Sequence, residues 1–214
     1  MERKMKNLVL VLVLFMLNTV CAQVSVLGGA SSAFPFGTGT PYVGLHLGLE
    51  VPRDDAVSFY GKFTHQFSQS KPYINFDNNP DDEFQTRMNY NIIEGGTRYY
   101  LGNGFDYGFA AYGGSTIKLI FNNVKSNYDM TQYAPTTVLN TNVKSSVFSV
   151  AFGLGGGVKY SFPRFGTIYC DLDLFYSLIQ VESTQGVIAN LYNNNQWRQL
   201  VFGCSIGYRK DLIW

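Results

Sequence analysis

Apolar and polar residues alternate along most of this chain. The alternation is clearest between Val57 and Ser68, where the odd positions are apolar apart from one glycine and one histidine, and the even positions are mostly polar. A period of two predicts a β-strand with one apolar and one polar face. The segment is also long enough to cross a bilayer as a tilted strand, which takes about 9 to 11 residues.

The same alternation predicts seven further strands. They span residues 24–28, 42–51, 88–101, 105–121, 148–162, 167–178 and 199–209. One of these segments breaks register, because its apolar residues occupy even positions up to Ile92 and odd positions from Ile93 onward. A β-bulge near this pair would reconcile the two halves.

Short and long connections alternate between the predicted strands. The short ones are Pro52–Asp55, Gly102–Gly104 and Pro163–Phe165, and the long ones are Ser31–Thr40, Ser70–Thr86, Asn123–Lys144 and Glu182–Asn195. Outer-membrane barrels have short periplasmic turns, long extracellular loops and an even number of strands, which places both chain ends in the periplasm. The sequence therefore predicts an all-β fold, an eight-stranded antiparallel up-and-down transmembrane β-barrel.

A soluble barrel of the lipocalin type is the main alternative fold. It would place its apolar residues inside, around a pocket. Here the apolar face is larger and more aromatic, whereas the polar face is rich in Gly, Ala and Ser, which suit a narrow lumen. Only 14% of the residues are charged, compared with about 25% in typical soluble domains. These features favour a barrel in lipid.

The N-terminus has the pattern of a secretory signal peptide. Its parts are the basic residues Arg3, Lys4 and Lys6, the apolar run Leu8–Leu17 and the cleavage site Val20–Ala22. The apolar run is too short for a membrane-spanning helix, which needs about 20 residues. We expect residues 1–22 to be removed and residues 23–214 to form the barrel. A retained signal anchor and a lipoprotein site at Cys21 are weaker alternatives.

Charge and cysteine content exclude several functions. Without residues 1–22 the chain has 13 basic and 14 acidic residues, so it lacks the basic excess of a nucleic-acid binder. No Cys and His residues have metal-ligand spacing, and we predict no metal and no cofactor. Cys170 and Cys204 fall on the apolar face of neighbouring strands, either as small apolar residues or as a disulfide.

Charged residues recur on the face predicted to line the lumen. Charges in a barrel core are costly unless they are paired. We therefore expect ion pairs within one group, Glu50, Lys62, Glu94, Arg98, Lys159, Asp171 and Asp173. Because an eight-stranded barrel has room only for its own side chains, we interpret the group as a salt-bridged plug. A gated polar pathway is the alternative.

Only two histidines could support catalysis. Enzymatic barrels need a His within hydrogen-bond reach of a nucleophile. His46 points inward near Glu50, His65 lies on the lipid face, and neither accompanies a nucleophile motif. The sequence therefore predicts that the protein is not an enzyme.

Three stretches resemble the small outer-membrane β-barrel superfamily, which includes OmpA-type, OmpX-type and PorT-like barrels, the last common in Bacteroidota. They are Cys21–Gln23, Tyr42–Leu49 and Gly95–Gly102 before a tight turn. The resemblance implies a barrel in the outer membrane of a Gram-negative bacterium, with a structural, adhesive or secretion-accessory role. The terminal Trp214 is similar to the aromatic residue that usually ends the last strand of these proteins.

The long loops carry further aromatic residues that are candidates for binding, namely Tyr128, Tyr133, Tyr192 and Trp197. Loops on a rigid scaffold commonly carry function. Our leading hypothesis is a non-enzymatic subunit of an outer-membrane assembly for secretion or uptake, or a barrel that binds external ligands through its loops. Its predicted partners are outer-membrane lipid and a larger protein complex. A narrow pore and a lipid-modifying enzyme are the alternatives.

Overall fold

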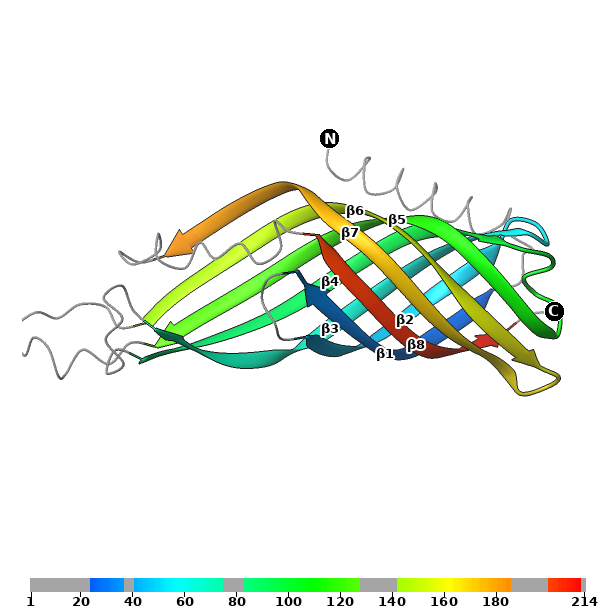
Figure 1. The fold of residues 1–214 in the computed structure, drawn as a ribbon, viewed down its shortest axis with the longest axis horizontal. Coiled ribbons are helices and arrows are strands. Elements are labelled where there is room, and N and C mark those ends of the chain that lie inside the picture. The colour runs from blue at the N-terminus through cyan, green and yellow to red at the C-terminus, as the bar shows by residue number, and fades with distance from the viewer. Residues whose placement is uncertain (1–23, 37–40, 75–82, 128–141, 186–199, 213–214) are drawn as a thin grey trace, which may run out of the picture.

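The computed structural model confirms an eight-stranded, closed, antiparallel β-barrel (Figure 1). It describes residues 24–36, 41–74, 83–127, 142–185 and 200–212. The strands are β1 (Ser25–Pro35), β2 (Tyr42–Pro52), β3 (Val57–Ile74), β4 (Glu83–Tyr100), β5 (Gly108–Asn127), β6 (Asn142–Phe162), β7 (Gly166–Gln185) and β8 (Val201–Asp211). Each strand pairs with its neighbours in chain order, and β8 closes the barrel against β1.

Among the described residues there is no helix with the length and apolar character needed to cross a membrane. The predicted signal peptide, residues 1–22, lies outside the described residues.

The two faces of the wall differ as the alternation predicts. On β2, Val43, Leu45, Leu47 and Leu49 are exposed on the outside. The alternate positions of β2 point into the lumen, where Tyr42, His46 and Glu50 are buried. The other strands also carry large apolar side chains outside, and most of their inward side chains are polar or charged, with apolar exceptions such as Ile92, Ile120 and Phe175. A soluble barrel has the reverse distribution, so the outer wall is suited to lipid.

The predicted β-bulge near Ile92 and Ile93 is wrong. β4 pairs with β5 without interruption from Gln85 to Tyr100. The irregularities lie elsewhere, between Gln66 and Gln69 on β3, and on β7 opposite the step from Val150 to Ala151. The sequence pattern misleads because Tyr90 and Ile92 are apolar yet point into the lumen, where both are buried.

The strands also continue into segments predicted to be loops. β1 includes Ser31–Pro35, and β3 to β7 all extend past the ends of the predicted apolar alternation. Beyond the membrane neither face of a strand contacts lipid, so a paired strand no longer needs an apolar side. At the other end of the barrel, Phe105 and Tyr107 were expected in a strand but lie in the β4–β5 turn.

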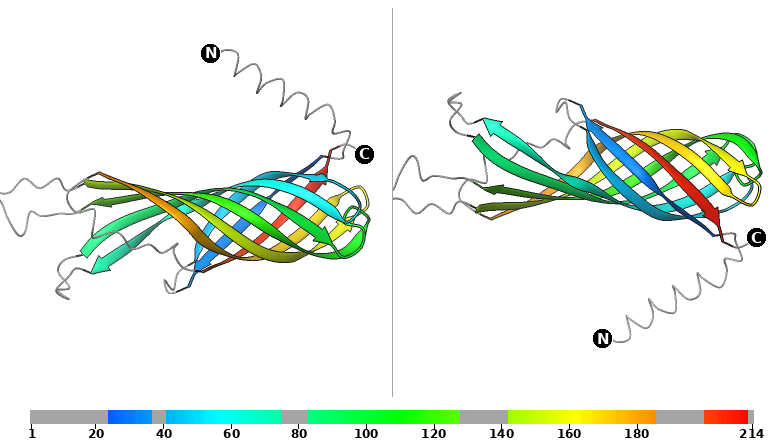
Figure 2. Two further views of the ribbon diagram at one scale, coloured as in Figure 1. Left: turned by 90° about the horizontal axis from the view of Figure 1, so that it is seen from above. Right: turned by 90° about the horizontal axis from the view of Figure 1, so that it is seen from below.

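The wall has two heights. β1, β2 and β8 have 11 residues each, whereas β3 to β7 have 18 to 21. The strands are level at the end that carries the short turns, where Ser25 of β1 pairs with Asp211 of β8. Five strands therefore project beyond the other three at the opposite end, which we call the loop end (Figure 2).

Glycines on the inner face make room for large side chains on the neighbouring strand. Gly157 pairs with Asp171 on one side and with Tyr112 on the other. A Cβ atom at Gly157 would lie 2.7 Å from the Tyr112 ring and still closer to the carbonyl oxygen of Cys170. The backbone can approach this tightly only without a side chain. The lumen is thus packed by large residues set against glycines.

This packing predicts the effect of adding one methyl group. Gly157→Ala should lower the free energy of unfolding by about 1–3 kcal/mol, because the methyl group meets the Tyr112 ring and backbone that cannot move away. Gly61→Ala is the matched control, since a Cβ there points outward and meets its nearest atom at 4.0 Å. Urea unfolding in lipid vesicles measures both variants, and equal stabilities would contradict the packing argument.

Candidate functional site

The lumen is centred on Arg98 of β4. Its Nη1 atom lies 2.6 Å from Glu50 Oε2, and its Nη2 atom lies 2.9 Å from Asp171 Oδ2. The guanidinium group therefore bridges β2 and β7 across the lumen. It is only 4% exposed, and buried charges of this kind are stable only when they are paired.

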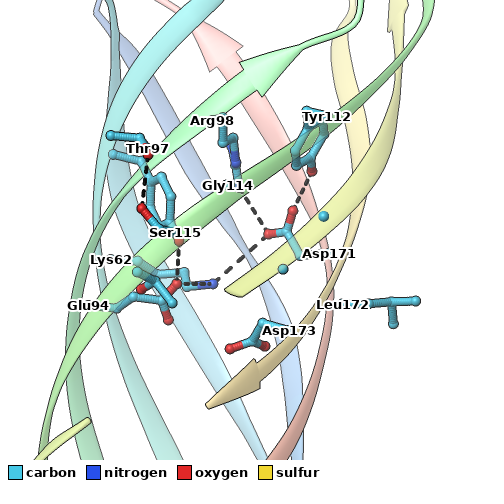
Figure 3. Close-up of a pocket in the computed structure, with 14 residues that line it drawn as sticks. Lys62, Glu94, Thr97, Arg98, Tyr112, Gly114, Ser115, Asp171, Leu172 and Asp173 are labelled. Atoms are coloured by element: carbon cyan, nitrogen blue, oxygen red, sulfur yellow. Dashed lines mark hydrogen bonds and ion pairs between the residues drawn. The ribbon is translucent and has the colours of Figure 1, made fainter. Parts of the chain in front are cut away.

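Aromatic rings enclose this guanidinium group. Its central carbon lies 4.7 Å from the ring centroid of Tyr60, 5.0 Å from that of Tyr112 and 5.2 Å from that of Tyr169. Cation–π contacts add stabilisation where the cation has lost its water. The Tyr112 hydroxyl also donates a hydrogen bond to Asp171 (Figure 3).

Glu50 is the most enclosed carboxylate, with no exposed surface. Besides Arg98, it accepts hydrogen bonds from Ser58 Oγ at 2.6 Å and from the Tyr100 hydroxyl at 2.5 Å. Arg209 Nη1 lies 3.5 Å from the same carboxylate. Both oxygens of Glu50 thus have partners, as a buried charge requires.

A second cluster lies nearer the loop end, around Glu94. Lys62 Nζ is 3.4 Å and Lys118 Nζ is 3.0 Å from the two Glu94 oxygens. Lys118 also pairs with Asp173 of β7. Lys62 Nζ lies 4.0 Å from Asp171 Oδ2 as well, and this contact joins the two clusters (Figure 3).

The charges in this part of the lumen balance. The carboxylates Glu50, Glu94, Asp171, Asp173 and Asp211 face the cations Lys62, Arg98, Lys118 and Arg209, and the buried Lys159 nearby is a fifth cation. The cavity between Tyr60, Lys62, Glu94, Arg98, Asp171 and Asp173 measures about 30 Å³, which suits water rather than a solute. The arrangement fills the lumen with paired charges, and its chemistry is that of a plug.

Six of the seven residues expected in an ion-pair network are brought together here, and Lys159 is not among them. Its Nζ instead donates to the Asp106 carbonyl oxygen at 3.0 Å and to Ser161 Oγ at 2.9 Å. The difference arises because Lys159 lies near the turn end, where Ser161 of the same strand and the β4–β5 turn supply acceptors. Sequence reasoning missed Lys118 and Arg209, although both occupy inward positions of the alternation.

A largely apolar cluster fills the lumen on the loop-end side of the network, beside the buried polar residues Thr64, Gln66 and Ser149. Its buried members are Ala33, Tyr42, Tyr90, Ile92, Ile120, Ala151, Phe175 and Val201. Ile92, Ile120 and Phe175 each lie two positions beyond a network residue, toward the loop end of their strands. Tyr42 and Tyr90 meet edge to face with their ring centroids 4.7 Å apart.

The β4–β5 turn folds over the opposite mouth of the lumen. Arg209 stacks on Phe105, with 4.7 Å between the guanidinium carbon and the ring centroid, and its Nη2 donates to the Gly104 carbonyl oxygen at 3.3 Å. The Phe105 ring also meets the Tyr100 ring at 5.8 Å. The neighbouring β2–β3 turn also holds it in place, because the Gly104 amide donates a hydrogen bond to the Asp55 carbonyl oxygen at 2.7 Å.

The histidines and cysteines take separate places. His46 Nε2 lies 2.6 Å from the Tyr169 hydroxyl, and His65 Nδ1 lies 2.7 Å from Asn91 Oδ1 on the outer face. Within the described ranges neither ring hydrogen-bonds a Ser or Cys, and no metal-binding cluster occurs. Cys170 and Cys204 are both free thiols.

The predicted loop-binding residues Tyr128, Tyr133, Tyr192 and Trp197 lie outside the described residues.

Comparisons with known proteins bear on the fold. No family model and no curated protein matches the chain. The chain is similar in structure to a major outer membrane protein from Thermus thermophilus, with a TM-score of 0.59 and 12% identity over 89% of this chain and 100% of that one. It is also similar to the outer membrane protein OprG from Pseudomonas aeruginosa, with a TM-score of 0.51 and 13% identity over 89% and 97% of the two chains. At these identities the likeness concerns the fold alone.

The network predicts a large cost for removing one partner. Glu50→Gln should lower the free energy of unfolding by about 3–5 kcal/mol, because Arg98 then keeps a buried charge without its nearest partner. The double variant Glu50→Gln/Arg98→Met should lose less than the sum of the two single variants, which a double-mutant cycle in lipid vesicles measures. The exposed Asp55→Asn serves as the control. Additive losses would contradict direct coupling.

Proposed function

We propose that the protein is a non-conducting outer-membrane barrel that works through its outer wall and its loop end, as a structural or accessory subunit of an outer-membrane assembly or as a receptor for external ligands. The observation that carries the proposal is the filling of the lumen by side chains. A largely apolar cluster, the ion-pair network and the Phe105 turn lie at three successive levels within it, which supports a barrel that does not conduct. A barrel filled in this way offers its surfaces, rather than its interior, to partners.

The apolar outer wall supports a location in a membrane. Both of the similar structures described above are outer-membrane proteins by name, which supports the outer membrane of a Gram-negative bacterium. We further propose that the turn end, with the start of β1 and the end of β8, faces the periplasm, and that residues 1–22 direct export. A PorT-like relationship and an origin in Bacteroidota stay predictions.

The alternative functions find less support. A pore would need a continuous hydrated path. The buried cluster that includes Tyr42, Tyr90 and Phe175 argues against such a path. A lipid-modifying enzyme would need a nucleophile beside a histidine, whereas His46 and His65 contact Tyr169 and Asn91.

Conductance tests the filled lumen directly. The protein inserted in a planar bilayer should show no ion-conducting steps, because the apolar cluster and the ion pairs fill the lumen. Lys62→Ala and Glu94→Ala should be equally silent, since the apolar cluster remains in both. A general porin added to the same bilayer checks that insertion is detectable. Discrete steps that change with Lys62 or Glu94 would favour the pore.

A pull-down in mild detergent from native outer membranes tests the accessory role. We expect one stoichiometric partner to be identified by mass spectrometry, because the function is assigned to the outer surfaces. The same preparation in a harsh detergent that separates complexes is the control. A barrel that comes out alone would contradict the accessory role and leave ligand binding at the loops.

A further inference from the structure

The turn between β6 and β7 has an unusual backbone. It consists of Pro163, Arg164 and Phe165, and it lies at the end of the barrel where β8 ends (Figure 1). Arg164 has a φ of 66°, a conformation that glycine adopts freely and that other residues rarely adopt. Within the described ranges it is the one residue other than glycine with a positive φ. Such strained positions persist where the surroundings impose them, and they are concentrated at functional sites.

The end of β8 holds this turn in place. Lys210 Nζ donates hydrogen bonds to the carbonyl oxygens of Arg164 at 3.0 Å and of Phe165 at 3.3 Å. The Tyr208 hydroxyl also donates to the Phe165 carbonyl oxygen. Gly166 leaves room for this contact, because a Cβ atom there would lie 2.7 Å from the ring carbon that bears the hydroxyl. Arg164 and Lys210 therefore occupy one place on the surface, where both residues are exposed.

A chain of aromatic rings lies against the same turn. The ring centroids of Tyr208 and Phe165 are 5.4 Å apart and those of Phe165 and Phe162 are 6.0 Å apart, both edge to face. Phe162 in turn lies 4.7 Å from Tyr160. Tyr160, Phe162 and Phe165 are exposed on the outer surface. Because aromatic side chains gather where acyl chains give way to headgroups, these rings place the turn at the height of lipid headgroups.

The outer face of β8 changes in character toward the turn end. Its outward positions are, in order, Cys204, Ile206, Tyr208 and Lys210, so apolar side chains give way to an aromatic ring and then to a cation. Lys210 is two residues past Tyr208, which is about 7 Å further along the strand. The order matches that of a phospholipid, in which the acyl chains are followed by the glycerol linkage and the phosphate group.

The other two turns at this end do not concentrate positive charge on the outer rim. The β2–β3 turn carries Asp54 and Asp55 beside Arg53, and the β4–β5 turn carries Asp106 and folds over the mouth of the lumen. The β6–β7 turn contains a basic residue and no acidic one, and Lys210 adds a second positive charge beside it. The rim therefore has one point that suits an anion.

Resting on the proposed orientation of the turn end toward the periplasm, we propose that Arg164 and Lys210 bind the phosphate group of one anionic glycerophospholipid of the periplasmic leaflet. The planar fork of an arginine suits two phosphate oxygens, and the Lys210 ammonium group adds a point charge. The rings of Phe162, Phe165 and Tyr208 would lie against the glycerol linkage and the first part of the acyl chains. An acidic segment of a periplasmic protein would also suit the cations. The rings continue the apolar outer wall, however, which favours a lipid.

Native mass spectrometry of the full-length protein, purified from outer membranes into a neutral detergent, tests the proposal. The probe is phosphatidylglycerol, and phosphatidylcholine, whose headgroup has no net charge, is the control lipid. We expect phosphatidylglycerol to saturate at a single molecule per barrel and phosphatidylcholine to bind at least about fivefold more weakly. Inorganic phosphate at millimolar concentration should not displace the lipid. Displacement would identify a site for free phosphate and overturn the lipid as its ligand.

Substitutions at the turn assign the site to these residues. Arg164→Gln should weaken phosphatidylglycerol binding by about tenfold or more, whereas Arg53→Gln at the β2–β3 turn should leave it unchanged. Arg164→Lys should bind with intermediate affinity, because the charge stays and the fork is lost. Arg164→Gly should lose binding but unfold at an equal or higher urea concentration in phosphatidylcholine vesicles, because glycine adopts the positive φ without strain. Equal binding by the wild type and Arg164→Gln, or no saturable binding, would overturn the proposal.

Thiol labelling in intact cells tests the orientation separately. Arg164→Cys should react with a maleimide too large to pass porins only after the outer membrane has been made permeable, and the wild type controls for Cys170 and Cys204. Reaction in intact cells would show that the orientation is wrong and would overturn the periplasmic leaflet as the source of the lipid. Protection in intact cells without saturable phosphatidylglycerol binding would mean that the orientation stands and the lipid site is wrong.

Discussion

The pairing of Arg98 with Glu50 and Asp171 is the interaction on which the rest of the lumen depends. A wall that faces lipid can carry few charges outside, so the charged side chains of the strands collect in a narrow interior. There they are stable only if each finds an opposite charge. Arg98 reaches across the lumen to two strands that are far apart in the sequence, and Lys62 links this pair to the Glu94 cluster.

The network constrains the backbone around it. Tyrosine rings that cover Arg98 occupy space that a Cβ atom would otherwise need, which explains why Gly96 lies against Tyr60 and Gly157 against Tyr112. The glycines therefore support the charged network, because they leave space for the tyrosine rings that cover Arg98. The side chains of the lumen are thus placed both by their ion pairs and by the space that the glycines leave.

The fold could be predicted from the sequence because a strand with one face in lipid must alternate strictly. The same parity identified most of the lumen charges, but it could not identify their partners. Lys118 meets Glu94 through the β4–β5 register, and Arg209 meets Glu50 across the closed barrel. Both contacts depend on non-local pairing. Tyr90 and Ile92 were misread because an apolar residue that plugs the lumen carries the same signal as one in lipid.

The unequal height of the wall also escaped the sequence pattern. β3 to β7 extend past β2 and β8 at the loop end, in segments where apolar and polar residues no longer alternate. Beyond the membrane a paired strand needs no apolar face, so a strand can continue there with a composition typical of loops. On β7 the exposed Leu178, Ile179 and Val181 keep the outer face apolar along part of this extension. The length of each strand is therefore set by pairing with its neighbours rather than by its own hydrophobicity, and such pairing leaves no signal within a single strand.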